Sequence, residues 1–225
     1  MAIDTSPKDV NLRVERALAA VHIPDWRESA VDLAKAVELN PGEPEYLGYY
    51  GPVLLLAGES AGYRRFCGTV LKRFGQTKNP RAAYLAARSL GLKADNGIKP
   101  AEGLRLASLA VQSSPKTPWY LHAMGMTHFR AGEYKQAILR LRESLNADPN
   151  WPGRVCNWLG LALAHQKLKH AEEAKEWLDK AALWLDKTRQ EAATKSFAFL
   201  GMHPHDLLSA LVLRREAESR IREKP

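Results

Sequence analysis

The sequence has little cysteine and no long apolar segment. Two cysteines in 225 residues, Cys67 and Cys156, are too few for the disulfide framework of a small secreted domain. Both lie in apolar helical contexts, so we expect buried and unreactive thiols. No apolar run approaches the roughly 18 residues that a membrane-spanning helix requires. The first ten residues contain two aspartates and no apolar core, unlike a secretory signal, so we expect a cytoplasmic protein that makes no membrane contact.

The alternation of apolar and polar residues that indicates β-strands is also missing. Alanine and leucine dominate an apolar content of 45%, and both favour helices. Prolines mark the junctions between the helical segments, as expected of a residue that cannot donate to a helix. The sequence predicts helices over residues 9–21, 26–39, 44–56, 60–74, 80–92, 99–113, 118–131, 134–147, 154–168, 171–187 and 205–222, and a long connection with a short helix over 187–202.

The stretch between Pro115 and Pro149 shows how these helices pack. Gly125 and Ala137 are small enough for two antiparallel helices to approach closely, with larger residues at three- and four-residue steps around them. Gly132 suits a left-handed cap after the first helix, and Pro149 stops the second. Pro115 lies 34 residues before Pro149, and a period of this length is typical of a helical solenoid.

At these residues the chain resembles the tetratricopeptide repeat (TPR) family, clearly over 118–149 and 155–181 and partially elsewhere. The resemblance implies an all-α fold, an α-solenoid of about five antiparallel helix pairs in one domain. The last helix is expected to cap the solenoid, apolar where it covers the final repeat and polar outward. The expected repeats lie near residues 10–43, 44–79, 80–117, 118–151 and 155–187, with the capping helix at 205–222.

Three stretches carry a narrower resemblance. YRRFCGTVLKRFG, PWYLHAMGMTHFRAGEY and HPHDLLSALVLRREAE are similar to the repeat tails of planctomycete-type bacterial proteins. In those proteins the repeats often follow a protein kinase, a WD-repeat domain or a similar domain. This resemblance implies a bacterial signalling context for the chain.

The net charge of +8 lies entirely after residue 79. Residues 1–79 carry ten basic and ten acidic side chains, residues 80–150 carry ten and five, and residues 151–225 carry thirteen and ten. A basic middle attracts an acidic peptide, RNA or an anionic surface, although a solvated helix surface has the same composition. No nucleic-acid-binding motif accompanies the charge, so a protein partner is the first expectation and nucleic acid the second.

Gly58 to Gly62 reads GESAG and fits the nucleophile elbow of serine hydrolases, in which Ser60 would attack an ester carbonyl. That elbow requires a parallel sheet, and the sequence has no alternation of strands and helices. We interpret Gly58 as the end of one helix and Ser60 as the cap of the next. We therefore expect no catalytic residue and no enzyme activity.

His203, His205 and Asp206 form a local cluster of metal-ligating side chains. A closed zinc site requires four ligands, and only three are close together in the sequence. We interpret Pro204 and Asp206 instead as the first turn of a helix, where both residue types are favoured. The sequence therefore predicts no metal site and no cofactor.

In the tetratricopeptide family the first helix of each pair lines a concave groove, and its exposed side chains contact the partner. Carried over to this sequence, the candidate partner-binding groove consists of Arg88, Trp119, His122, Met126, Phe129, Arg130, Gln166 and Lys167. The centre of this groove is apolar and aromatic and its edges are basic, which suits a peptide or helix with apolar anchors and some acidic character. The alternative is that each of these side chains packs against the next repeat.

Three functions follow from these observations, in order of preference. The first is a protein-interaction scaffold that binds a peptide or helix, which the narrower resemblance would make the tail of a larger bacterial signalling protein. The second is a basic helical-repeat module that binds RNA or another polyanion, and the third is a serine hydrolase that uses Ser60. Polyanion binding falls steeply with the logarithm of the salt concentration, so a salt titration separates the first two.

Overall fold

The computed structural model describes residues 9–19, 25–192 and 202–222, and all regular structure in these ranges is helical. This confirms the predicted all-α solenoid. No helix among the described residues is long and apolar enough to cross a membrane. The helices are α2 (Val10–Ala19), α3 (Trp26–Leu39), α4 (Glu45–Leu56), α5 (Ser60–Phe74), α6 (Pro80–Leu90), α7 (Pro100–Ser113), α8 (Pro118–Arg130), α9 (Tyr134–Ala147), α10 (Arg154–Lys167), α11 (Ala171–Ala192) and α12 (Pro204–Ile221).

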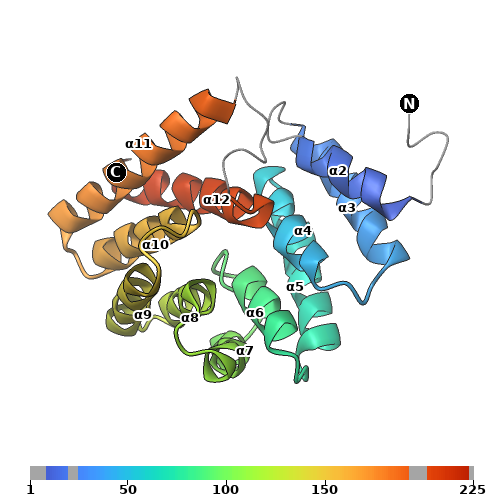
Figure 1. Ribbon diagram of the computed structural model, residues 1–225, viewed down its shortest axis with the longest axis horizontal. Coiled ribbons are helices and arrows are strands. Elements are labelled where there is room, and N and C mark those ends of the chain that lie inside the picture. Colours follow the sequence, from blue (N-terminus) through green and yellow to red (C-terminus); the bar gives the residue numbers. More distant parts are fainter. Residues whose placement is uncertain (1–8, 20–24, 193–201, 223–225) are drawn as a thin grey trace.

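Ten of these helices form five successive antiparallel pairs, from α2 and α3 to α10 and α11. The first helices of neighbouring pairs also contact each other, α4 with α6, α6 with α8 and α8 with α10. These four helices therefore form a continuous inner layer, and their partners lie outside it (Figure 1). Such an arrangement gives a solenoid one concave surface, lined by the first helix of each pair.

The glycines that the sequence assigned to tight contacts and caps have those roles. A Cβ atom added at Gly125 would lie 2.7 Å from Cγ of Leu141, so only glycine allows α8 and α9 to approach this closely. Gly58 and Gly132 both have φ near +82°, the left-handed conformation that ends α4 and α8. Lys169 has φ +63° at the equivalent turn after α10, where glycine is the usual residue.

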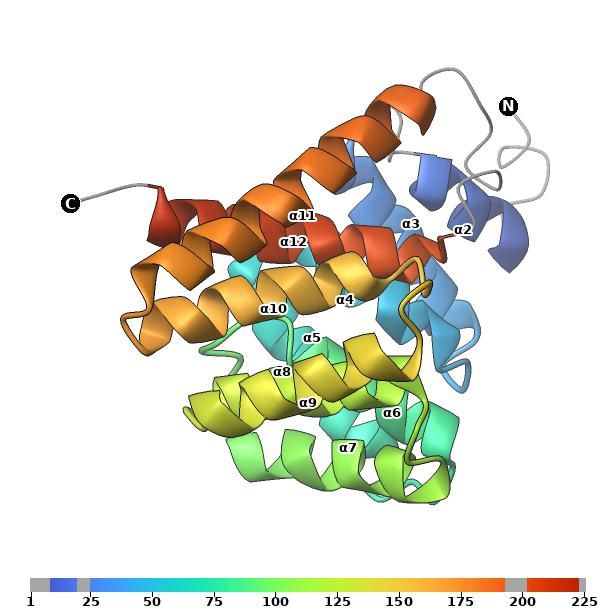
Figure 2. The same cartoon turned by 60° about the vertical axis from the view of Figure 1, so that its left-hand side comes forward.

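The final helix, α12, runs along the concave side of the solenoid. It contacts α10 and α11 of the last pair, as a capping helix would, and it also reaches α4 of the second pair. Figures 1 and 2 show it crossing between these elements, beside the inner layer. Burial accounts for this position of α12. Residues 205–210, 212 and 213 are buried, so the first half of the helix is surrounded on every side. If α12 covered only one end of the solenoid, part of the surface of its first half would be exposed to water.

One predicted boundary is wrong, because α11 does not end near Lys187 but continues to Ala192. Asp186, just before this extension, forms an ion pair with Arg214 of α12 at 2.5 Å, and Thr188 within the extension is buried. The burial of Thr188 is consistent with a continued helix where the local sequence indicated a connection. The rest of the predicted connection, 193–201, lies outside the described residues.

Candidate functional site

The concave surface and α12 form one packed unit, because α12 belongs to two hydrophobic cores at once. Leu208 and Val212, one helical turn apart, join the core that is built mainly from α3 to α8. On the opposite face, Ala210, Leu213 and Ala217 join the core that is built from α8 to α11. Each face of α12 thus follows the three- and four-residue spacing of a helix stripe. The concave surface is therefore covered by a helix of the same chain.

A buried ion pair fixes the start of α12. Nη2 of Arg88, on α6, lies 2.8 Å from Oδ1 of Asp206, and these side chains are only 3% and 4% exposed. Arg88 also donates to the carbonyl oxygen of His205 at 3.3 Å and to the hydroxyl of Tyr84 at 3.1 Å. Burial alone would raise the pKa of Asp206, but the charge of Arg88 outweighs it and holds that pKa below its usual range. The pair therefore stays charged at neutral pH.

A second arginine, Arg130 at the end of α8, binds the second half of α12. Its Nη1 and Nη2 donate to the two carboxylate oxygens of Glu216 at 2.8 and 2.6 Å, in the two-pronged geometry that arginine and carboxylate share. Its Nε donates to the carbonyl oxygen of Gly91 at 2.9 Å, and Nη2 also donates to that of Leu92. The side chains of Arg130 and Glu216 are 7% and 14% exposed, so this pair lies nearer to solvent than Arg88 and Asp206.

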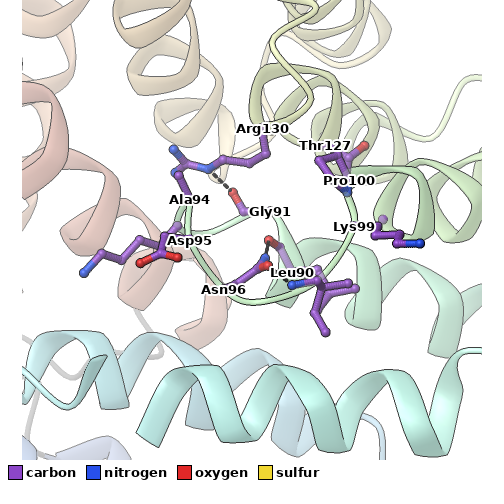
Figure 3. A pocket seen from close by; sticks show the side chains of 12 residues that line it. Leu90, Gly91, Ala94, Asp95, Asn96, Lys99, Pro100, Thr127 and Arg130 are labelled. Atoms are coloured by element: carbon purple, nitrogen blue, oxygen red, sulfur yellow. Dashed lines mark hydrogen bonds between the residues drawn. The ribbon is translucent and has the colours of Figure 1, made fainter. Parts of the chain in front are cut away.

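The loop between α6 and α7 fixes the position of Arg130 by accepting hydrogen bonds from it. Figure 3 shows this loop around a small pocket of about 80 Å³, with Arg130 reaching the carbonyl of Gly91. The side chain of Asn96 donates to the carbonyl of Leu90 at 2.7 Å, and its Oδ1 accepts from the backbone N–H of Ile98 at 2.8 Å. These bonds hold the loop in shape, and its carbonyl oxygens orient the guanidinium of Arg130 toward Glu216.

Weaker polar contacts complete the docking of the second half. Nη1 of Arg215 donates to the carbonyl oxygen of Leu56, at the end of α4, at 2.9 Å. The side-chain amide of Gln166, at the end of α10, donates to the carbonyl oxygen of Arg220 at 3.1 Å. Both bonds join solvent-facing ends of helices to the rim of the concave surface.

The eight predicted groove residues divide by burial. Arg88, His122, Met126 and Phe129 are buried, so they offer no free surface in this conformation. Arg130 and Gln166 are partly buried and contact α12, as described above. Trp119, at the start of α8, is 37% exposed, and Lys167, at the end of α10, is exposed. The groove residues nearest to solvent are therefore those at its two rims.

His122 bonds to the next repeat rather than to α12. Its Nδ1 lies 2.9 Å from Oδ1 of Asn157 on α10, whose amide donates to Oγ of Ser144 on α9 at 2.8 Å. Ser144 in turn donates to the carbonyl oxygen of Pro118. Burial, assisted by the charge of Arg88, lowers the pKa of His122 to about 3, so this imidazole is neutral at physiological pH.

Ser60 does not lie on a nucleophile elbow in the described part of the chain. It is the first residue of α5, the described residues contain no strand that could carry an elbow, and its hydroxyl accepts from Nζ of the exposed Lys93 at 3.1 Å. The expectation that its side chain caps α5 is wrong, because the N-terminus of α5 has no side-chain cap. Lys93 instead draws the hydroxyl toward the α6–α7 loop.

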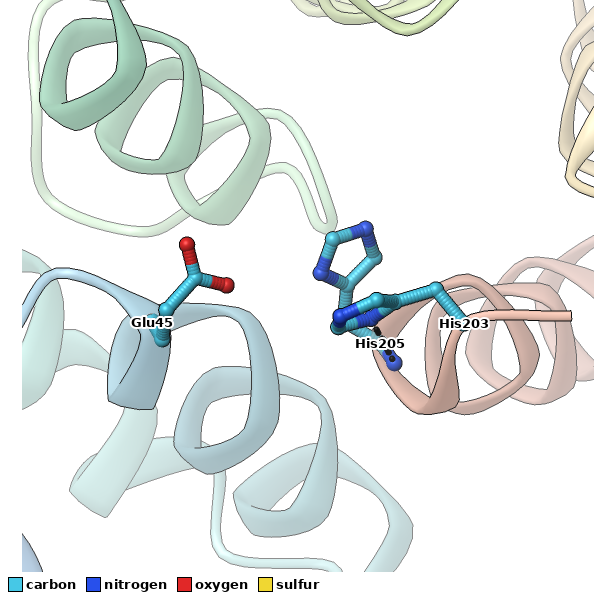
Figure 4. A group of neighbouring side chains, drawn as sticks. All are labelled: Glu45, His203 and His205. Carbon is cyan, nitrogen blue, oxygen red and sulfur yellow. Dashed lines mark hydrogen bonds between the residues drawn. The ribbon is translucent and has the colours of Figure 1, made fainter. Parts of the chain in front are cut away.

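The two histidines at the start of α12 lie close to a carboxylate that the sequence did not indicate. Asp206 points to Arg88, while Glu45, in the first turn of α4, faces His203 and His205 (Figure 4). One oxygen of Glu45 and one ring nitrogen of each histidine lie within 4.8 Å of one another. No spacing in the sequence signals this contact, since an acidic residue in a first turn is common for its favourable interaction with the helix dipole.

Comparison with known proteins supports the tetratricopeptide resemblance. Residues 157–184, in α10 and α11, match a family model described as a tetratricopeptide repeat. A thermophilic TPR protein of Thermus thermophilus is 16% identical with a TM-score of 0.56, over 95% of this chain and 100% of that one. PilW, a widely conserved type IV pilus biogenesis factor, is 14% identical with a TM-score of 0.50, over 80% and 79%. At these identities the likeness shows the fold alone, and no curated protein matches the sequence.

Proposed function

We propose that this chain is a protein-interaction scaffold that recognises a helix in its concave surface, with α12 as the built-in occupant. The observation that carries the proposal is α12 itself, which is held there by two arginine–carboxylate pairs and by apolar contacts on two faces. This is the helix-in-groove mode of recognition, in which apolar anchors supply affinity and charged pairs fix the register.

The occupant indicates the chemistry of a partner. Asp206 and Glu216 are ten residues apart, which is about 15 Å along a helix and spans the distance between Arg88 and Arg130. Leu213 and Ala217 supply the apolar contacts near the second pair. A partner helix that competes for this surface would therefore carry an acidic residue opposite Arg130 and small or apolar residues on the same face.

Competition is easiest at the second half of α12. Beyond Leu213 only Ala217 is fully buried, and the contacts there are mostly polar, from partly buried at Arg130 to exposed at Gln166. Segments with few buried apolar contacts open at lower free energy than the core. We infer that a partner displaces this half and pairs with Arg130 and Gln166, and that Trp119 and Lys167 supply further contacts at the rims.

Binding of RNA or another polyanion has less support. The two arginines of the candidate groove, Arg88 and Arg130, are already neutralised by Asp206 and Glu216. We also propose that the partner is a signalling protein in the cytoplasm. The support for this is the resemblance of three stretches to the repeat tails of planctomycete-type bacterial proteins.

A charge-swap experiment tests the groove. The probe is a fluorescent peptide with the sequence of residues 203–222, and the readout is its fluorescence anisotropy with the full chain. In the Glu216→Arg chain, the introduced charge repels Arg130 and weakens the hold on the second half of α12. We expect this chain to bind the peptide at least about tenfold more tightly than the unmodified chain, which corresponds to ~1.4 kcal/mol.

The matched control is the same peptide carrying Glu216→Arg, which has no carboxylate to offer Arg130. It is expected to bind neither chain. If the Glu216→Arg chain binds both peptides equally, the interaction does not use Arg130. If it binds neither, α12 cannot be exchanged for another helix and the proposed groove function is wrong.

A further inference from the structure

The cluster of Glu45, His203 and His205 has the composition of a metal site. Its ligand atoms come from two elements far apart in the sequence, the first turn of α4 and the start of α12. Figure 4 shows the carboxylate of Glu45 facing the two imidazole rings, and the three candidate ligand atoms lie within 4.8 Å of one another. Nδ1 of His203 accepts from the backbone N–H of His205 at 3.4 Å, which leaves its Nε2 for a ligand.

Two buried polar atoms in this cluster have no partner in the described part of the chain. They are Oε2 of Glu45 and Nδ1 of His205. His205 is 6% exposed, so its ring is shielded from bulk solvent. Buried polar atoms are nearly always satisfied in folded proteins, and a bound ion is one of the recognised explanations for an exception. Of the five buried polar atoms without a partner in the described residues, these two belong to one cluster, so one ion would satisfy them together.

Neighbouring groups orient both ligands as the outer partners of a metal site do. Nε of Arg81 donates to Oε1 of Glu45 at 2.6 Å, which directs the other oxygen to the histidines. Nε2 of His205 lies 3.3 Å from Oδ1 of Asp206 and 3.2 Å from the hydroxyl of Tyr84. The hydroxyl of Tyr84 thus holds Nε2 of His205 beside the charge of Asp206, which leaves the other ring nitrogen for a metal.

We propose that Glu45, His203 and His205 bind one zinc-class divalent cation and thereby tie the start of α12 to the start of α4. Two imidazoles and one carboxylate suit zinc, which takes nitrogen and oxygen ligands at about 2.0–2.2 Å. Hard cations such as Mg²⁺ prefer oxygen ligands only. Three protein ligands leave a fourth position for water or for a group of a partner, as in open zinc sites.

The metal site stands independently of the groove function, since it rests on the geometry of three side chains. Only its effect on partner access depends on the proposed function. Zn²⁺ bound here would hold the first half of α12 in place, because an ion that binds only the folded arrangement stabilises it. The second half, which carries Glu216, would remain available for exchange.

Isothermal titration of the full chain with Zn²⁺, after treatment with a chelator, tests the site. His203→Ala is the decisive variant because His203 is exposed, so its loss does not disturb the core. We expect one zinc ion per chain, at least about tenfold weaker binding after His203→Ala, and no binding of Mg²⁺. Glu45→Gln is expected to weaken binding as well, because it removes the charge of one ligand.

The chain supplies its own matched control. His165, His170 and Glu173, at the turn between α10 and α11, form a second group of ligand atoms within 4.8 Å. His170→Ala removes an exposed histidine from that group and is expected to leave the zinc affinity unchanged. A loss of affinity that follows His170→Ala and not His203→Ala would overturn the assignment, as would a chain that binds no Zn²⁺.

Cobalt gives a second readout that depends on the ligands and not on stability. Co²⁺ in a site with nitrogen and oxygen ligands absorbs visible light, and the band should disappear in His203→Ala and persist in His170→Ala. Identical spectra in the two variants would place the metal elsewhere. The peptide experiment above does not contain added metal, so failure of the metal site and failure of the groove are distinguishable.

Discussion

The two halves of α12 sit in different surroundings although they form one continuous helix. Residues 205–210, 212 and 213 of the first half are buried, and its ion pair, Arg88 with Asp206, is nearly inaccessible to solvent. In the second half Ala217 is the buried residue, and the pair of Arg130 with Glu216 lies closer to water. The same chemical pairing therefore has two roles: the first pair belongs to the core, and the second is a docking contact at the rim.

This difference indicates which part of a bound helix can exchange. A charge that loses its partner in the core remains buried and strongly destabilises the fold, whereas a charge at the rim regains water. The first half of α12 is thus an integral part of the solenoid, and the second half is the part for which we propose that a partner competes.

The largest expected effect is that of Arg88→Met, which leaves the carboxylate of Asp206 buried without its cation. We expect the free energy of unfolding, measured by urea denaturation, to fall by ~3–5 kcal/mol. The double variant with Asp206→Leu should recover much of this loss, because neither charge then remains. Arg64→Met is the control, since its pair with Asp95 is exposed and should contribute ~0–1 kcal/mol. A loss in Arg88→Met as small as in the control would remove the distinction between the halves.

Mild acid should weaken the solenoid through His122, which lies on α8 of the inner layer. Burial lowers the pKa of His122 to about 3 against about 6.5 in the unfolded chain, so the unfolded chain takes up the proton first. The stability is complete above pH 6.5 and falls by ~1.4 kcal/mol per pH unit as pH decreases toward 3. Arg88 on α6, Asn157 on α10, and His205 and Asp206 on α12 face or influence this imidazole.

Urea denaturation at pH 6.5 and pH 5 measures this effect, with an expected loss of ~2 kcal/mol from His122 alone. His122→Gln should make the decrease smaller. Glu216 does not contribute to the pH dependence of stability in this range. Burial would raise its pKa, but Arg130 lowers it below the usual value. The stability that Glu216 contributes is therefore lost only as pH falls below about 4.5. An equal pH dependence with and without His122 would show that this histidine is not buried as described.

The smallest effect is expected for Glu216→Gln at the rim. Arg130 keeps its hydrogen bonds to the carbonyl oxygens of Gly91 and Leu92. The loss of one charge should therefore reduce the free energy of unfolding by only ~1 kcal/mol. Limited proteolysis should then cleave near the end of α12 faster than in the unmodified chain. A loss as large as that of Arg88→Met would mean that both pairs belong to the core.

Local residues predicted most of the fold, because helix ends depend on neighbours in the sequence. Gly58 and Gly132 mark the ends of α4 and α8 by the left-handed conformation that glycine readily adopts. Gly125 indicated the close approach of α8 and α9. The extension of α11 from residue 188 to Ala192 was not predictable in this way, because no local residue indicated it.

The candidate site was less predictable, because its contacts join residues far apart in the chain. Arg88 and Arg130 were identified as groove residues by their place on the first helices, but nothing local indicated that Asp206 and Glu216 would bind them. Glu45 was missed for the same reason. A single sequence shows which face of a helix is apolar, and it does not show which other helix will cover that face.

Amide hydrogen exchange along α12 tests the central claim most directly. We predict that the amides of residues 207–213 exchange only when the whole chain unfolds, and that those of 214–221 exchange through a local opening of lower free energy. Glu216→Gln should accelerate exchange of the amides of residues 214–221. The amides of residues 207–213 should still exchange only through global unfolding. Equal protection of the two halves, or faster exchange in 207–213, would contradict the division of α12 into a core half and an exchangeable half.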